Sequence, residues 1–233
     1  MAGAIFGSFI ATLVLRWPEA KSLRGRSACD SCAKQLGAIE LVPLLSYLAL
    51  RGRCRHCNAP IDRFHFQVEL TAGVIGAIAL GLLPTIAGLL LAVMGWLLLP
   101  LFILDVRHLW LPDRLTALLA LIGLAFAGFA NELSLFDRAL GGFVGAASLG
   151  LIAYLYRKTR GHDGMGSGDP KLFGAIGCWI GWQLLPVALL VGSAGLLAIV
   201  LLRGSARDGA AQHPLGAGLA VGGFLTFGWQ LVA

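Results

Sequence analysis

The chain has 233 residues, of which 58% are apolar and only 13% are charged, and its mean hydropathy is +0.81. Soluble domains are about half apolar and about a quarter charged, so this composition excludes an ordinary soluble protein and indicates an integral membrane protein. The net charge of +6 comes from 18 basic and 12 acidic residues. In a membrane protein such basic residues are topology signals. We therefore expect a lipid bilayer around the chain and no nucleic-acid partner.

The apolar residues form eight runs along the chain. The first is short for a membrane span, which needs about 20 residues. Pro84 and Pro186 each separate two neighbouring runs. The runs predict spans at residues 2–15, 66–83, 85–104, 115–130, 139–156, 172–185, 187–202 and 215–232.

The predicted fold is an all-α polytopic membrane protein with about eight transmembrane helices. A polar insertion between the first two carries four cysteines and indicates a small, cytoplasmic, zinc-ribbon-like domain. Within it, residues 41–50 form an apolar run too short to cross, which predicts an interfacial or packed helix. We divide the chain into a first transmembrane helix (1–15), a tetracysteine domain (16–65) and a seven-helix membrane domain (66–233).

The basic residues lie almost entirely on one side of this predicted topology. Eight spans place 17 of the 18 lysines and arginines on one side and leave only Arg138 on the other. By the positive-inside rule that side is the cytoplasm. The cytoplasmic loops are then residues 16–65, 105–114, 157–171 and 203–214.

Two Cys-x-x-Cys pairs, Cys29 with Cys32 and Cys54 with Cys57, are separated by 21 residues. Two such pairs can supply four thiolates to one tetrahedral Zn²⁺, and the reducing cytoplasm favours metal binding over disulfides. Four protein ligands leave no open position on the metal, so we predict a structural zinc. A metal-free cysteine cluster and a redox pair are the alternatives.

Four aspartates, Asp105, Asp113, Asp163 and Asp169, lie in the predicted cytoplasmic loops beside spans. An acid close to lipid is costly and marks a candidate functional site. Asp113 and Asp169 can instead act as N-caps of the helices that follow them. Asp163 lies in the middle of its loop and is expected to be solvated.

Asp105 has no such capping role, because it ends an apolar run at a helix C-terminus, where the macrodipole disfavours an anion. Arg107 is available to pair with it. The helix N-terminus is expected to lower the pKa of Asp169 and so to separate the pKa values of the two acids. Two carboxyls of different pKa can activate a water and protonate a leaving group. We therefore predict an aspartyl dyad with Asp169 as the base and Asp105 as the acid.

Gly166 and Gly168 belong to a glycine-rich stretch that ends at Asp169 and superficially resembles a phosphate-binding loop. Such a loop needs a preceding strand in a βαβ unit, which this sequence does not predict. We expect instead an active-site loop that lets an extended peptide backbone lie close to Asp169. Lys171 can steady a carboxylate or a substrate carbonyl, or serve only as another cytoplasmic charge.

These segments together resemble the type IV prepilin peptidases, which are bifunctional leader peptidases and N-methyltransferases among the membrane aspartic proteases with a Gly-x-Gly-Asp motif. The resemblance covers nearly the whole chain, and the combination of motifs is specific. The segments that carry it are Gly7-Ser8-Phe9, Arg16-Trp17-Pro18, Pro43-Leu44-Leu45-Ser46-Tyr47, Arg51-Gly52-Arg53-Cys54-Arg55-His56-Cys57, Val68-Glu69-Leu70-Thr71, Asp105 with Leu111-Pro112-Asp113, and Gly166-Ser167-Gly168-Asp169.

The resemblance implies a membrane aspartic endopeptidase of the bacterial inner membrane with Asp105 and Asp169 as its catalytic pair, facing the cytoplasm. Its expected substrates are prepilins or pseudopilins of pilus and type II secretion systems, cut after a glycine that ends a short basic leader. It also implies N-methylation of the new N-terminal residue, typically phenylalanine, with S-adenosylmethionine. The family's Asn-Val pair is replaced here by Ile10-Ala11-Thr12, and Pro170 replaces a usual apolar residue.

Two other classes of function fit parts of the sequence. A proton-coupled membrane transporter would use the intramembrane acids and helices broken at Pro84 and Pro186. The halves show no repeat, however, and the acids lie at span ends. A zinc-ribbon scaffold for nucleic acid or a protein partner would leave Asp105 and the glycine-rich stretch unexplained.

Overall fold

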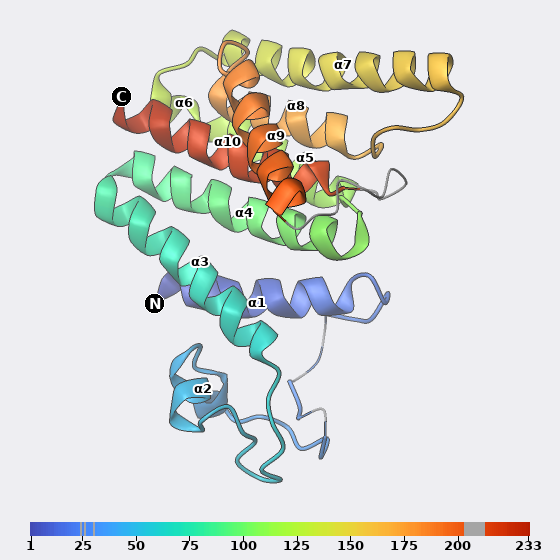
Figure 1. Cartoon of the computed structure of the whole chain (residues 1–233). Coiled ribbons are helices and arrows are strands. Elements are labelled where there is room, and N and C mark those ends of the chain that lie inside the picture. Colours follow the sequence, from blue (N-terminus) through green and yellow to red (C-terminus); the bar gives the residue numbers. More distant parts are fainter. Residues whose placement is uncertain (24, 26, 30, 203–212) are drawn as a thin grey trace. The chain divides into compact units, whose positions relative to one another are not determined.

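The structure is a computed structural model that describes the whole chain apart from residues 24, 26, 30 and 203–212. Its described part is helical, with two isolated β-bridges beside the cysteines and no strand, which confirms the predicted all-α class (Figure 1). The residues form two compact units, Met1–Gly81 and Leu82–Ala233. The predicted division at residues 15 and 65 followed the expected membrane spans and the polar insertion between them, and it stays a prediction.

Each predicted apolar run is found in a helix, because long uncharged runs satisfy their backbone hydrogen bonds internally. In the first unit these helices are α1 (Ala2–Arg16) and α3 (Arg63–Leu82), and the short elements η1 (Ala38–Leu41) and α2 (Leu45–Ala49) lie between them. The second unit contains α4 (Ile86–His108), α5 (Asp113–Phe126), α6 (Gly128–Asn131), α7 (Leu135–Arg160), α8 (Asp169–Ile180), α9 (Leu185–Leu202) and α10 (Leu215–Val232).

Among the described residues, five helices are long and apolar enough to cross a membrane, namely α3, α4, α7, α9 and α10. The helices α1, α5 and α8 have 15, 14 and 12 residues, fewer than the roughly 20 that a span requires. The chain is thus a multi-pass membrane protein, and the count of eight spans is not confirmed. Helix α8 ends before its predicted end at residue 185, because Gly181 takes a left-handed φ of 74°. Most of the predicted 203–214 loop lies outside the described residues.

Small residues let α1 and α3 pack backbone against backbone in the first unit. A Cβ added at Gly3 would lie 2.5 Å from the carbonyl oxygen of Ala72, and one at Gly7 would lie 2.6 Å from the Cα of Glu69. Helices in lipid gain little from the hydrophobic effect, so close van der Waals packing of small residues holds them together. The opposite face of α1 carries large apolar side chains such as Ile5, which is exposed.

Close backbone packing at glycines also joins α7 to α8 in the second unit, where the two helices lie side by side (Figure 1). A Cβ added at Gly141 would collide with the carbonyl oxygen of Gly177, and one at Gly177 would collide with that of Gly141. Farther along α7, a Cβ at Gly145 would lie 2.7 Å from the carbonyl oxygen of Phe173. Glycines therefore determine how closely these helices approach.

Arg138, the one basic residue predicted on the far side of the membrane, is buried in the second unit. Its guanidinium donates hydrogen bonds to the carbonyl oxygens of Gly123 and Leu124 in the last turn of α5. Carbonyls in a last helical turn have no partner within their own helix. Arg138 therefore supplies hydrogen-bond donors to carbonyl groups at the end of α5. This packing role explains why one basic residue lies on the side of the predicted topology that has no other.

We expect Gly141→Val to destabilise the protein, because the new side chain would force α7 away from α8. Gly150→Val is the matched control, since it adds the same side chain to the same helix where an added Cβ meets nothing within 4 Å. Thermal unfolding in detergent should show a Tm about 5 °C or more lower for Gly141→Val than for the control. Equal losses for the two variants would contradict the close-packing role.

Candidate functional site

Asp105 lies in the last turn of α4, and its side chain is turned toward the start of α10. The carboxylate is 5% exposed, and its Oδ2 accepts a hydrogen bond of 2.7 Å from the backbone N–H of Ala217. Ala217 is in the first turn of α10, whose amides have no intrahelical partner. The N-terminal end of α10 thus offsets the unfavourable position of Asp105 at the C-terminal end of α4.

Asp169 is the first residue of α8 and is equally buried, at 5% exposed. Its Oδ2 accepts a hydrogen bond of 3.1 Å from the backbone N–H of Gly166, in the preceding loop. The N-cap of α8 is Gly168, and no side chain caps the helix. The prediction that Asp169 serves as a cap is therefore wrong, because its carboxylate points back to the glycine-rich loop.

The two aspartates meet at Gly216, the second residue of α10. A Cβ added at Gly216 would lie 2.9 Å from Oδ2 of Asp105 and 3.0 Å from Oδ1 of Asp169. Both carboxylates thus border one point of the α10 backbone, although 63 residues separate them in the sequence. A side chain at residue 216 would displace at least one of them, so glycine is required there.

The pKa of Asp169 is raised, not lowered. Burial, and secondly the Asp105 carboxylate, raise it from an ordinary value of 3.8 to about 6, while backbone hydrogen bonds from Gly166 and Gly216 act in the opposite direction. The expectation that the helix N-terminus would lower this pKa is wrong, because burial and a like charge outweigh the helix end. Two carboxyls this close titrate as a pair and can share one proton.

The glycine-rich loop packs against the segment that follows α4. A Cβ added at Gly168 would lie 2.7 Å from the Cβ of Leu111, and one at Gly166 would lie 3.3 Å from Oδ2 of Asp169. The loop therefore comes close to the Asp105 segment at Gly168, while Gly166 is exposed. That an extended peptide lies along this loop stays a prediction.

Lys171, in the first turn of α8, forms an ion pair with Asp113 at 2.7 Å between Nζ and Oδ1. Asp113 is the first residue of α5, and Pro112 takes the N-cap position predicted for it. Both side chains are more than half exposed, so the pair adds little stability. The pair joins the first turn of α5 to the first turn of α8, which begins with the buried Asp169. Lys171 is therefore directed at Asp113.

The four predicted metal ligands of the first unit lie together. The Sγ atoms of Cys29, Cys32, Cys54 and Cys57 are all within 4.8 Å of one another, and none is in a disulfide. A tetrahedral ion with metal–sulfur bonds of about 2.3 Å holds its thiolates about 3.8 Å apart. The Cys29 and Cys57 sulfur atoms are 3.8 Å apart. This donor set fits a metal such as zinc and leaves no open position for catalysis.

Each cysteine pair lies in a turn of the same design. The N–H of Cys54 donates to the carbonyl oxygen of Ala59, and the N–H of Asn58 donates back to the carbonyl oxygen of Cys54, at 2.8 and 3.0 Å. The first pair has the equivalent bonds. In the second pair, the N–H of His56 also donates to the Cys54 sulfur at 3.4 Å, as suits a thiolate. The local geometry is thus prepared for a metal.

Two family models match the chain. Residues 1–82 match the bacterial peptidase A24 N-terminal domain, and residues 91–202 match the type IV leader peptidase family. The chain belongs to the type IV leader peptidase family. The boundary between the two matched regions lies close to the boundary between the two compact units. Family membership gives no support to the transporter hypothesis.

Curated members of this family extend the match over most of the chain. A protein of Aeromonas hydrophila is 38% identical, over 88% of this chain and 71% of its own length. Others from Burkholderia pseudomallei and Pseudomonas aeruginosa are 39% and 32% identical, and the chain covers 66% and 88% of their lengths. Each is named a prepilin leader peptidase/N-methyltransferase. No solved structure matches the chain.

The start of α10 is the part of this candidate site that sequence reasoning missed. Gly216 and Ala217 contact the carboxylates through backbone atoms, so no functional side chain marks them. Leu111, which packs on Gly168, lies in a recognised motif but was given no role. The sequence feature that could have indicated this contact is the pair of small residues, Gly216 and Ala217, at the beginning of an apolar helix.

The raised pKa of Asp169 predicts a pH-dependent stability. The folded protein binds more protons than the unfolded chain between about pH 4 and about pH 6, so this residue destabilises the fold as the pH rises through about 6. We expect the Tm of Asp169→Asn, relative to the parent protein, to increase as the pH is raised from about 4 to about 7.

Thermal unfolding in detergent measures this difference. Asp163→Asn, at an exposed position of the same loop, controls for the loss of one carboxyl. A Tm difference between Asp169→Asn and the parent that stays constant with pH would contradict the raised pKa.

Proposed function

We propose that this chain is a membrane aspartic endopeptidase that removes the leader peptides of prepilins or pseudopilins, with Asp105 and Asp169 as its catalytic pair. One observation carries the proposal: both buried carboxylates border Gly216 at the start of α10. Buried acids in an apolar helical body are expensive and need a reason. The names of the family's curated members supply the substrate class.

The proposed reaction is hydrolysis of one peptide bond by a carboxyl pair that shares one proton. The ionised carboxylate takes a proton from water, whose oxygen attacks the scissile carbonyl carbon. The protonated carboxyl stabilises the developing oxyanion, and a proton then passes to the leaving nitrogen as the C–N bond breaks. Because the Asp105 carboxylate contributes to the raised pKa of Asp169, the two acids titrate together, and the shared proton belongs to the pair and not to either residue.

We further propose that the site faces the cytoplasm of a bacterial cell, in the inner membrane. The loop with Gly166 and Gly168 and the segment that follows Asp105 belong to the predicted basic side of the chain. Arg138, the exception to this asymmetry, has the packing role described above. A basic leader would reach the aspartates from this side.

The second proposed activity is N-methylation of the residue freed by cleavage, with S-adenosylmethionine as the methyl donor. It rests on the full name of the family's curated members. The proposed metal is one structural zinc held by Cys29, Cys32, Cys54 and Cys57. Zinc would fold the tetracysteine region, which has few buried apolar side chains, and would take no part in peptide hydrolysis.

Cleavage of a synthetic prepilin peptide tests the peptidase proposal. The peptide carries a basic leader and a Gly-Phe junction, and mass spectrometry follows its cleavage by the purified protein in detergent. We expect Asp105→Asn and Asp169→Asn each to lower the rate by about 100-fold or more, and the double variant to lose little beyond either single change. Asp163→Asn should keep the parent rate. Full activity in either dyad variant would refute the proposal.

Metal content tests the zinc proposal separately. We expect about one zinc per purified chain, by elemental mass spectrometry, and a clear loss in Cys54→Ser. Cys178→Ser is the matched control, because Cys178 is buried in α8 and lies outside the cluster. A parent protein purified without zinc, or equal zinc in the two variants, would overturn the assignment.

A further inference from the structure

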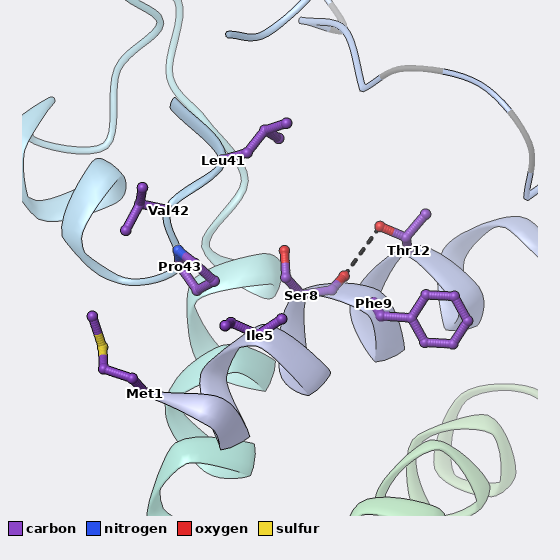
Figure 2. Close-up of a pocket in the computed structure, with 8 residues that line it drawn as sticks. All are labelled: Met1, Ile5, Ser8, Phe9, Thr12, Leu41, Val42 and Pro43. Carbon is purple, nitrogen blue, oxygen red and sulfur yellow. Dashed lines mark hydrogen bonds between the residues drawn. The ribbon is translucent and has the colours of Figure 1, made fainter. Parts of the chain in front are cut away.

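An apolar cavity and an aromatic contact lie outside the sites described above. The cavity, of about 510 Å³, runs along α1 in the first unit, and among the described residues no charged side chain lines it (Figure 2). The aromatic contact is at the C-terminal end of α7, where Tyr156 packs on the loop that leads to Asp169. It bears on the proposed reaction, because the same loop donates a hydrogen bond to the Asp169 carboxylate.

The loop of residues 161–168 is flexible by composition. Four of its eight residues are glycine, which loses more conformational freedom on folding than any other residue. The loop nevertheless needs a defined conformation, because the backbone nitrogen of Gly166 lies 3.1 Å from Oδ2 of Asp169 and donates to it. Near its end, Gly168 packs on Leu111. The beginning of the loop needs an anchor of its own.

The last turns of α7 supply this anchor. The helix ends at Gly161, whose φ of 75° is left-handed. The rings of Tyr156 and His162 then meet edge to face, with their centroids 5.5 Å apart. A Cβ added at Gly164 would lie 2.5 Å from Cε1 of Tyr156, so the ring packs directly on the backbone there. One tyrosine thus contacts the loop on both sides of Asp163.

A charged contact accompanies the aromatic one but adds little to it. Arg157, the neighbour of Tyr156, pairs with Asp163 at 3.5 Å between Nη1 and Oδ1. Both side chains are more than half exposed, and ion pairs at the surface contribute little. The tyrosine ring is therefore the main anchor, since it packs on backbone that Gly164 leaves uncovered.

We propose that Tyr156 is a positioning residue of the peptidase site, which holds the glycine-rich loop so that the Gly166 N–H stays on the Asp169 carboxylate. The inference rests on the proposed peptidase function and deepens it. Tyr156 acts through the loop and not on the reacting atoms. Gly164 and Gly166 are two residues apart, a span of at most about 7 Å, so a shift of the backbone at Gly164 reaches the donor that Asp169 uses.

The Gly166 N–H is one of several groups that set the pKa of Asp169. Burial and the Asp105 carboxylate raise this pKa, whereas the backbone hydrogen bonds from Gly166 and Gly216 lower it. Loss of the Gly166 bond would therefore raise the pKa of Asp169 further. The carboxyl pair would then keep both protons up to a higher pH, although one carboxylate has to be ionised to activate water. The acidic limb of the pH–rate profile should move to higher pH.

Other charged side chains at the helix ends near Asp169 are exposed. Helices α9 and α10 contain no titratable side chain. Because water and salt screen exposed charges, the backbone bond from Gly166 is the local influence that loss of Tyr156 would change. The exposed charged side chains are Arg107 and His108 in α4, Asp113 and Arg114 in α5, Arg157, Lys158 and Arg160 in α7, Asp163 in the loop, and Lys171 in α8.

Replacing Tyr156 tests this role. Cleavage of the synthetic prepilin peptide by the full-length protein in detergent is measured from about pH 4 to about pH 8. We expect Tyr156→Ala to lower kcat about tenfold or more, to change KM less than about twofold, and to move the acidic limb to higher pH. Tyr156→Phe keeps the ring and should retain the parent kcat and pH profile. Tyr154→Ala, at an exposed position of the same helix, is the matched control.

A substitution in the loop tests the same contact from its other side. Gly164 is not among the glycines with a positive φ, so alanine fits its backbone, but the added methyl group would press on the Tyr156 ring. We expect Gly164→Ala to lower kcat and to move the acidic limb as Tyr156→Ala does. The double variant should lose little beyond Tyr156→Ala, because the methyl group then meets no ring. Additive losses would contradict the contact.

The outcomes separate this role from the proposed function. If the parent does not cleave the peptide, or Asp169→Asn cleaves it as fast as the parent, the proposed peptidase fails and this inference fails with it. If the parent cleaves and Tyr156→Ala keeps the parent kcat and pH profile, the peptidase stands and the positioning role is overturned. A lower kcat with an unmoved acidic limb, or an equal loss in Tyr156→Phe, would show a merely structural effect and overturn it as well.

Discussion

The second unit depends on burying two carboxylates at the first turn of one helix. Asp105 and Asp169 come from different helices, and both lie against the start of α10. There Gly216 has no side chain, and the N–H of Ala217, which has no partner within α10, donates to Asp105. The free helix end offsets part of the cost of burying the acids. The ends of α4, α8 and α10 must therefore meet at one point, and that requirement constrains the loops between them.

Glycine makes this convergence possible. Helices α7 and α8 touch through the backbones of Gly141 and Gly177, so α8 is fixed closely enough to hold its first residue beside α10. In the loop before α8, Gly168 admits Leu111 from the segment after α4. A membrane protein has little hydrophobic driving force between helices, and close contact of small residues takes its place.

The first unit is built on different chemistry. Its four cysteines form two similar turns that can hold one metal, and two acids, the buried Glu69 and the partly exposed Glu40, hold the 41–43 segment between them. These carboxylates hydrogen-bond to backbone amides within the unit, whereas the aspartates of the second unit lie next to each other. The two units thus use their acidic side chains in different ways.

The sequence by itself determined the features that depend on local patterns. Apolar runs predicted the helices, Cys-x-x-Cys spacing predicted the metal cluster, and the cost of acids near lipid singled out Asp105 and Asp169. Tertiary structure alone decided that these aspartates meet at Gly216, that Lys171 pairs with Asp113, and that Asp169 is buried enough to raise its pKa. The physical reason is range: propensity and helix-end effects act within a few residues, whereas burial and like-charge repulsion arise from segments brought together across the whole chain.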